Sequence, residues 1–222
     1  MKKNILKIAG IVALVTGFAY CAGPKKAMES AQTLKEAYKK DFLVGAAINA
    51  TQIEEKDAVA AMVIPKQFNA ITPENIMKCE VIHPEWDKYN FVLADKIIEY
   101  GQKYNMPVHG HTLIWHSQLS TFARRINDAD SFRAFFTNHI TTVAGRYNGK
   151  VASWDVVNEA LDEDGSMRKS IFFNKLGPDY VVEAFRLAQK ASPNAELYYN
   201  DYNNEQPNKR AGCIALIKKI QA

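Results

Sequence analysis

VASWDVVNEAL, residues 151–161, decides the fold, because a run of β-branched and apolar residues ends there in a carboxylate. The run predicts a buried strand, with Asn158 and Glu159 at its carboxyl end. Barrels of parallel strands carry their chemistry on residues that follow these carboxyl ends. An Asn-Glu pair alone is more often a turn than a catalytic site, so the rest of the chain has to decide between the two.

Strand and helix patterns alternate along the chain. Apolar runs predict strands over residues 42–48, 69–72, 106–115, 151–159 and 196–200, the first of them fully buried. Apolar residues at helical spacing predict helices over residues 28–40, 58–68, 90–98, 132–143, 181–188 and 214–220, with Asn90 as an N-cap. A helix therefore follows each strand, which favours a parallel sheet with crossover helices.

Two parallel architectures fit this order. An open, doubly wound sheet of five strands fits the count, but no glycine-rich phosphate loop follows any strand. A closed barrel needs roughly 250 residues, and these 222 residues supply about five of its units. We therefore predict an α/β fold, a (β/α)8 TIM barrel truncated after roughly the fifth βα unit, over residues 24–222.

Residues 1–23 have the pattern of an export signal. Lys2 and Lys3 precede an apolar run, Ile8 to Phe18, that is too short to span a bilayer. These lysines also contribute to the net charge of +4, and what remains is near neutral, so nothing indicates a nucleic-acid partner. We expect an exported protein, secreted or periplasmic, with no transmembrane span.

Cys21 leaves a second form of export open. Cleavage after Cys21 or Ala22 gives a plain exported chain, whereas lipidation of Cys21 gives an outer-membrane lipoprotein. Tyr20 is a poor residue before a lipidated cysteine, which favours plain export. A third interpretation is that residues 1–23 form the first helix of the fold. The other two cysteines, Cys79 and Cys213, can form at most one pair and show no metal-ligand spacing.

Three more motifs accompany the Asn-Glu pair. They are FNAITPENIMKCE (68–80), HGHTLIWHSQ (109–118) and YYNDYN (198–203). Together with residues 151–161 they closely resemble glycoside hydrolase family 10, the retaining endo-xylanases, and the resemblance extends over roughly residues 27–222. It implies an endo-1,4-beta-xylanase that hydrolyses internal β-1,4-xylosidic bonds with retention of configuration. The implied partners are xylan and xylo-oligosaccharides, and no cofactor is implied.

The resemblance also implies roles for particular residues. Glu159 matches the acid/base at the end of the fourth strand, which protonates the glycosidic oxygen. The residues that match sugar-binding positions are Asn158 and His111 at the cleaved sugar, Trp115 as a wall of the same subsite, Glu74, Asn75 and Lys78 on the non-reducing side, and Tyr202 toward the aglycone.

The residue pattern alone leaves other readings open. Glu74 and Lys78 are four residues apart, which suits a surface ion pair on a helical turn. His109 and His111 share a strand face, as zinc ligands can, but no later strand tip offers a histidine, so we expect no metal. Trp115 could equally be core packing. We expect His109 and His139 to be structural, and one of Tyr198 and Tyr199 to be core.

The second carboxylate of a glycosidase is absent from this pattern. Glycoside hydrolysis uses two carboxyl groups, and the family's nucleophile follows the seventh strand, for which no segment matches here. Asp155 lies four residues before Glu159 on the same strand, too far from the strand tip to be the second carboxylate. The pattern of residues 162–164 is typical of a solvated acidic loop. A non-catalytic, truncated product that at most binds xylan weakly is therefore the alternative to an enzyme.

Overall fold

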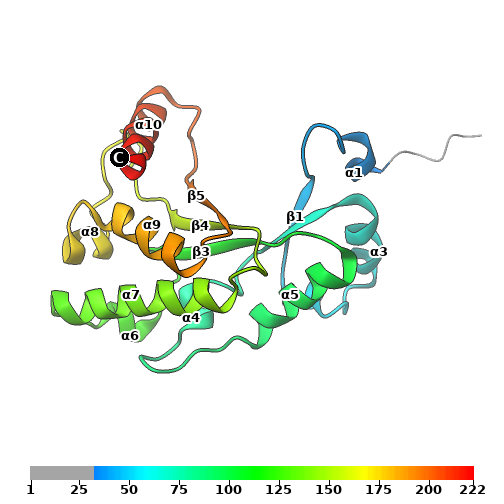
Figure 1. Cartoon of the computed structure of the whole chain (residues 1–222), viewed down its shortest axis with the longest axis horizontal. Helices are drawn as coiled ribbons and strands as arrows, with labels where there is room; N and C mark the ends of the chain where they lie inside the picture. Colours follow the sequence, from blue (N-terminus) through cyan, green and yellow to red (C-terminus); the bar gives the residue numbers. More distant parts are fainter. Residues whose placement is uncertain (1–32) are drawn as a thin grey trace, which may run out of the picture. The chain divides into compact units, whose positions relative to one another are not determined.

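Five parallel strands follow one another in chain order in the computed structural model, which describes residues 33–222 (Figure 1). They are β1 (Gly45–Ile48), β2 (Ala70–Pro73), β3 (His109–Trp115), β4 (Ser153–Asn158) and β5 (Glu196–Asn200). β1 pairs with β2, and β4 pairs with β3 and with β5. A bridge between Ile71 and Val108 joins the two groups of strands, so spatial order follows chain order, as in a barrel.

Helices connect consecutive strands. The crossover helices after β1 to β4 are α3 (Ala58–Gln67), α5 (Val92–Tyr104), α7 (Ala129–Arg146) and α9 (Tyr180–Ala191), and α10 (Pro207–Gln221) follows β5. α7 packs on β3 and on α9, which in turn covers β4 and β5 (Figure 1). Asp57 and Asp128 cap α3 and α7, because their carboxylates accept backbone N–H groups of the first turn.

Four-residue or six-residue helices account for most of what the sequence pattern missed. They are α2 (Ala50–Ile53), α4 (Cys79–Ile82), α6 (Thr121–Arg124) and α8 (Ile171–Leu176). The helix predicted over residues 28–40 is confirmed only as α1 (Leu34–Ala37), and residues 28–32 lie outside the described part. Asn90 is not the N-cap of α5, which is Phe91, although its side chain accepts the Val92 N–H at 3.3 Å.

The prediction of a fully buried first strand is wrong. β1 begins only at Gly45, and Phe42 and Leu43 are each 59% exposed. Within the described residues β1 pairs on one edge only, so the side chains that lead into it lack a neighbour on the other. The export signal and Cys21 lie outside the described residues. Between residues 33 and 222, no helix is both long enough and apolar enough to cross a membrane.

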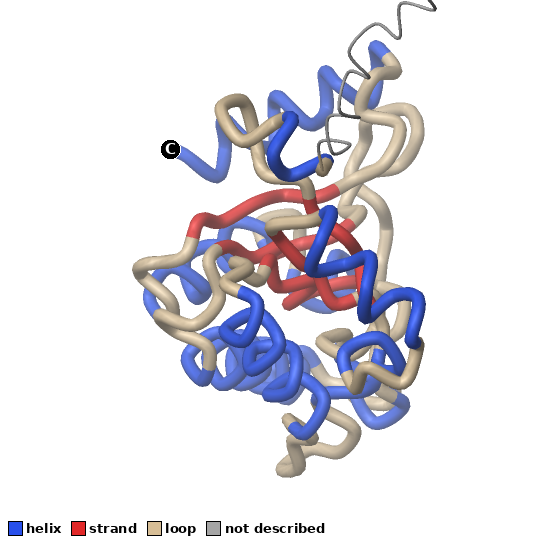
Figure 2. Tube along the Cα trace, turned by 90° about the vertical axis from the view of Figure 1, so that its right-hand side faces the viewer, coloured by secondary structure: helices blue, strands red, loops and turns tan. Residues whose placement is uncertain are grey.

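The core lies between the strands and their helices (Figure 2). The apolar face predicted for residues 132–143 is confirmed, because Phe132, Phe135 and Phe136 of α7 are at most 1% exposed. His139 belongs to the same buried face, where burial lowers its imidazole pKa to about 3. Trp154 of β4 is fully buried against Gly110 of β3, where an added Cβ would stand 2.2 Å from the indole ring.

Candidate active site

The carboxyl ends of neighbouring strands bring the predicted residues together. Trp115, Asn158 and Asn200 occupy matching register positions at the ends of β3, β4 and β5. The side-chain amides of Asn158 and Asn200 lie 2.9 Å apart. Because Asn158 is buried, this contact meets the need of its amide for a polar partner. The strand tips therefore form one continuous polar edge.

Glu159 projects from that edge. Its backbone is left-handed, with φ at 56°, which is uncommon for a residue other than glycine. One carboxylate oxygen, Oε2, accepts a hydrogen bond of 3.0 Å from the indole Nε1 of Trp115. The side chain of Asn158 lies 3.5 Å from the other oxygen. The carboxyl group is thus half-buried and held from two neighbouring strands.

Lys78 and Asn75 lie beside Trp115. The Lys78 ammonium is 4.7 Å from the centre of a Trp115 ring and donates to Asn75 Oδ1 at 3.0 Å. Gln118 donates to the same oxygen at 3.2 Å. Burial lowers the pKa of Lys78, an effect opposed by the charges of Glu74, Glu80 and Glu159. Lys78 therefore faces the strand tips, and the helical turn that the surface ion pair required is not formed.

His111 is fixed by a buried carboxylate. Its Nδ1 lies 2.8 Å from Asp155 Oδ2, and Nε2 of His109 lies 3.0 Å from the same oxygen. His109 also contacts Ser153 Oγ at 2.7 Å. Burial raises the pKa of Asp155, but the bonds from the two imidazoles outweigh it and hold the pKa below its usual value. The prediction that His109 and His111 share a strand face is confirmed, and both imidazoles contact Asp155 on that face.

Glu74 and Tyr202 lie at the margins of this cluster. The side chain of Glu74 is exposed after the end of β2. Tyr202 is 42% exposed, and its hydroxyl accepts from Arg168 Nη2 at 3.1 Å. Of the neighbouring tyrosines, Tyr199 packs against the core and Tyr198 is 46% exposed, so the prediction that one of them is core is confirmed.

Three residues around Glu159 were not singled out from the sequence. Arg168 donates to the Glu159 carbonyl at 3.0 Å, and Lys209 and Asp201 form an ion pair of 3.0 Å with both side chains fully buried. Asp201 lies inside the YYNDYN motif, so the motif offered a signal. Arg168 lies in a loop, and Lys209 lies near the start of α10. Neither position is marked by a motif or a periodic pattern, so the sequence offered no signal for them.

The described residues contain no group of three histidine, cysteine or acidic side chains arranged to hold a metal ion. Cys79 and Cys213 are both free and buried. Cys79 lies 3.5 Å from Ser120 Oγ, and burial raises the pKa of its thiol. The polar groups gathered at the strand tips are therefore carboxyl, amide, ammonium, imidazole and indole groups, all of which bond well to sugar hydroxyls.

Comparison with known proteins decides the family. The model of Glycosyl hydrolase family 10 matches residues 33–222. The chain belongs to glycosyl hydrolase family 10. The fold predicted from the motifs is thereby confirmed, because the described residues also resemble solved family 10 structures. Xylanase 10B from Thermotoga maritima is 39% identical, with a TM-score of 0.81 over 85% of this chain and 60% of that one.

Curated family 10 relatives give the same result. Endo-1,4-beta-xylanase A of Xylanibacter ruminicola is 40% identical over 195 residues, which is 86% of this chain and 53% of the relative. Beta-1,4-xylanase of Dictyoglomus thermophilum is 38% identical over 213 residues, which is 95% of this chain and 59% of the relative. The chain thus spans between half and three-fifths of the length of these relatives.

Proposed function

We propose that residues 33–222 carry the acid/base side of the active site of an endo-1,4-beta-xylanase. The observation that carries the proposal is the contact between Trp115 Nε1 and Glu159 Oε2 at the tips of β3 and β4. It places a carboxyl group beside an aromatic face, among side chains that bond to hydroxyls. The relatives at 38–40% identity named above are xylanases, which supports xylan as the substrate.

Glu159 is the residue that transfers the proton. In its acid form it gives the carboxyl proton to the glycosidic oxygen as the bond from that oxygen to the anomeric carbon breaks. A nucleophilic carboxylate, which the resemblance places on the seventh strand, bonds to the anomeric carbon and forms a xylosyl-enzyme. Glu159 then removes a proton from the water that releases the sugar, so the anomeric configuration is retained.

The remaining side chains bind sugar on either side of the cleaved bond. His111, Trp115 and Asn158 contact the sugar whose bond breaks, and the imidazole of His111 is oriented by its 2.8 Å contact with Asp155. Glu74, Asn75 and Lys78 bind sugars farther toward the non-reducing end, and Tyr202 lines the aglycone side. An ammonium and an amide suit a xylose unit, which offers several hydroxyls and little apolar area.

The proposal includes export of the protein, because xylan lies outside the cell. Residues 1–23 would direct the chain to a secreted or periplasmic location, and lipidation at Cys21 would instead anchor it to the outer membrane. Plain export is the form that Tyr20 favours.

A joined barrel tests the proposed function. Residues 33–222 are fused to the last three barrel units of the Dictyoglomus thermophilum relative, and the product is incubated with xylan. We expect release of reducing sugar, with the first product in the β configuration by proton NMR. A folded joined barrel that leaves xylan intact, or releases the α anomer first, contradicts the proposal.

A further inference from the structure

Every backbone polar group of residues 159–161 has a hydrogen-bond partner. The N–H groups donate to Asn200 O (2.9 Å), Tyr199 Oη (3.1 Å) and Asp201 Oδ2 (3.4 Å), in chain order. The carbonyls accept from Arg168 Nε (3.0 Å), Arg168 N (2.8 Å) and Arg168 Nη2 (2.9 Å). The segment that begins with Glu159 is thus held on one side by Arg168 and on the other by β5 and the residue after it.

Lys209 connects this segment to α10. Its Nζ donates to the Leu161 carbonyl at 2.9 Å and lies 3.0 Å from Asp201 Oδ1. It also stands 4.4 Å from the ring centre of Tyr202. Asp201 uses its second carboxylate oxygen for the N–H of Leu161 and the hydroxyl of Tyr199. The ion pair therefore contacts both backbone polar groups of Leu161, the last residue of the segment 159–161.

The burial of this pair makes it rigid. Both side chains have no exposed surface, and a buried charge that loses its partner is strongly disfavoured. A shift of α10 away from residues 159–161 would consequently break this buried pair. Close backbone packing points the same way, because a Cβ on Gly212 of α10 would lie 2.2 Å from the Gly165 carbonyl oxygen.

Such rigidity matters at Glu159 because its backbone is left-handed, a conformation that persists only where the surroundings over-determine it. Small changes in that backbone turn the carboxyl group away from the glycosidic oxygen. A misplacement of about 1 Å can lower a rate about 100-fold.

We propose that Asp201 and Lys209 are positioning residues that fix the direction of the Glu159 carboxyl group through the backbone of residues 159–161. This inference rests on the proposed acid/base role of Glu159. A purely structural ion pair would support the stability of the fold and leave the geometry of Glu159 unchanged when it is replaced by neutral side chains.

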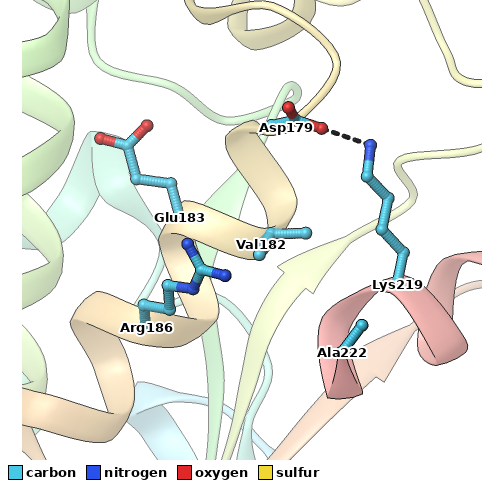
Figure 3. Close-up of a pocket in the computed structure, with 6 residues that line it drawn as sticks. All are labelled: Asp179, Val182, Glu183, Arg186, Lys219 and Ala222. Atoms are coloured by element: carbon cyan, nitrogen blue, oxygen red, sulfur yellow. Dashed lines mark hydrogen bonds and ion pairs between the residues drawn. The ribbon is translucent and has the colours of Figure 1, made fainter.

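The test uses the joined barrel with Asp201→Asn and Lys209→Met together. Because both charged side chains are replaced by neutral ones, no buried charge is left without a partner, and the variant can fold. Lys219→Met is the matched control, since Lys219 also lies on α10 and pairs with Asp179, but at an exposed site (Figure 3). Folding of each variant is checked by circular dichroism.

The first measurement is the indole N–H resonance of Trp115, assigned with Trp115→Phe. This group donates to Glu159 Oε2, so its resonance reports the position of the carboxyl group without any catalysis. We expect the resonance to move in the double variant and to stay in place in Lys219→Met. An unmoved resonance in the double variant overturns the proposal.

The second measurement compares two substrates. We expect kcat on xylan to fall about 10–100-fold in the double variant, and the first step on an aryl xyloside with a very good leaving group to fall less than about threefold, since it needs little protonation. Equal losses on both substrates, or none on xylan, overturn the proposal. If the unsubstituted joined barrel does not hydrolyse xylan, the proposed function fails, and the indole resonance alone decides on the positioning role.

Discussion

The side chain of Glu159 has a single indole donor on one oxygen and a left-handed backbone beneath it, so its chemistry depends on details that one substitution can isolate. Glu159→Gln keeps the shape of the side chain and removes the proton donor. In the joined barrel we expect kcat on xylan to fall about 100–10,000-fold, with little change in the binding of xylo-oligosaccharides. The rate of the first step on an aryl xyloside with a very good leaving group should fall far less. Burst kinetics and calorimetric binding measure the two effects.

Glu163→Gln is the matched control for that substitution. Glu163 lies four residues further along, is exposed, and contacts Asn203. Its replacement should leave xylan turnover unchanged. The acid/base assignment is wrong if the two glutamine variants are equally active on xylan.

Lys78 and Asn75 allow a second prediction at the residue scale. They contact one another, and Lys78 lies over a ring of Trp115, whose indole N–H donates to Glu159. A hydrogen bond to a charged group contributes about 1.5–3 kcal/mol. We therefore expect Lys78→Ala and Asn75→Ala to lower kcat/KM on long xylo-oligosaccharides about 10–100-fold, and to affect an aryl xyloside that fills only the cleavage subsite much less. Equal losses on the two substrates would show that these residues do not bind remote sugars.

Sequence motifs predicted the residues at the strand tips, because the carboxyl ends of parallel strands converge whatever the side chains are. They did not single out Arg168 or Lys209, whose partners are backbone carbonyls of residues 159–161. A lysine on a helix is usually solvated, and its burial depends on the fold of β5 and the loops around it. Positioning groups of this kind are therefore visible only in three dimensions.

At the scale of elements, period and length decided what could be predicted. β5 was predicted with its observed bounds, Glu196–Asn200, and α3 to within one residue. Helices of one turn, such as α4 and α6, contain too few residues to show a period. β1 begins later than the apolar run predicts, because apolar side chains on an unpaired edge can be exposed.

The contact between β3 and β4 supports a prediction about packing. A Cβ on Gly110 would lie 2.2–2.7 Å from three atoms of the buried Trp154 indole. Gly110→Ala should therefore lower the free energy of unfolding by about 1–3 kcal/mol through overpacking. Gly145→Ala is the control, because its Cβ would meet nothing closer than 4.0 Å and α7 favours alanine over glycine. Urea unfolding of the joined barrel measures both.

A smaller ring at position 154 checks the cause. Gly110→Ala combined with Trp154→Phe should lower the free energy of unfolding by less than the sum of the two single substitutions. The reason is that the smaller ring makes room for the methyl group. Additive losses would mean that the strain at Gly110 has another origin.

At the scale of the whole molecule, the described residues form a five-strand arc with two unpaired edges. One edge carries exposed apolar side chains beside β1 and on α3, namely Phe42, Leu43, Val59, Met62 and Val63. The other carries a groove between β5, α9 and α10 whose lining includes the side chains of Phe185, Leu197, Tyr199, Ile217 and Ile220. Unpaired strands and apolar patches favour association with other chains.

These edges lead to the last prediction: residues 24–222 expressed alone are poorly soluble and inactive on xylan. Glu159 can give a proton, but the resemblance places the attacking carboxylate on a seventh strand, and the described residues form five. Co-expression with the last three barrel units of a family 10 relative should cover both edges and supply that carboxylate. We expect soluble protein and release of reducing sugar only from the co-expressed pair, and a pair with Glu159→Gln should regain solubility without regaining activity. If residues 24–222 alone hydrolyse xylan at a rate near that of intact relatives, a second catalytic carboxylate lies within them.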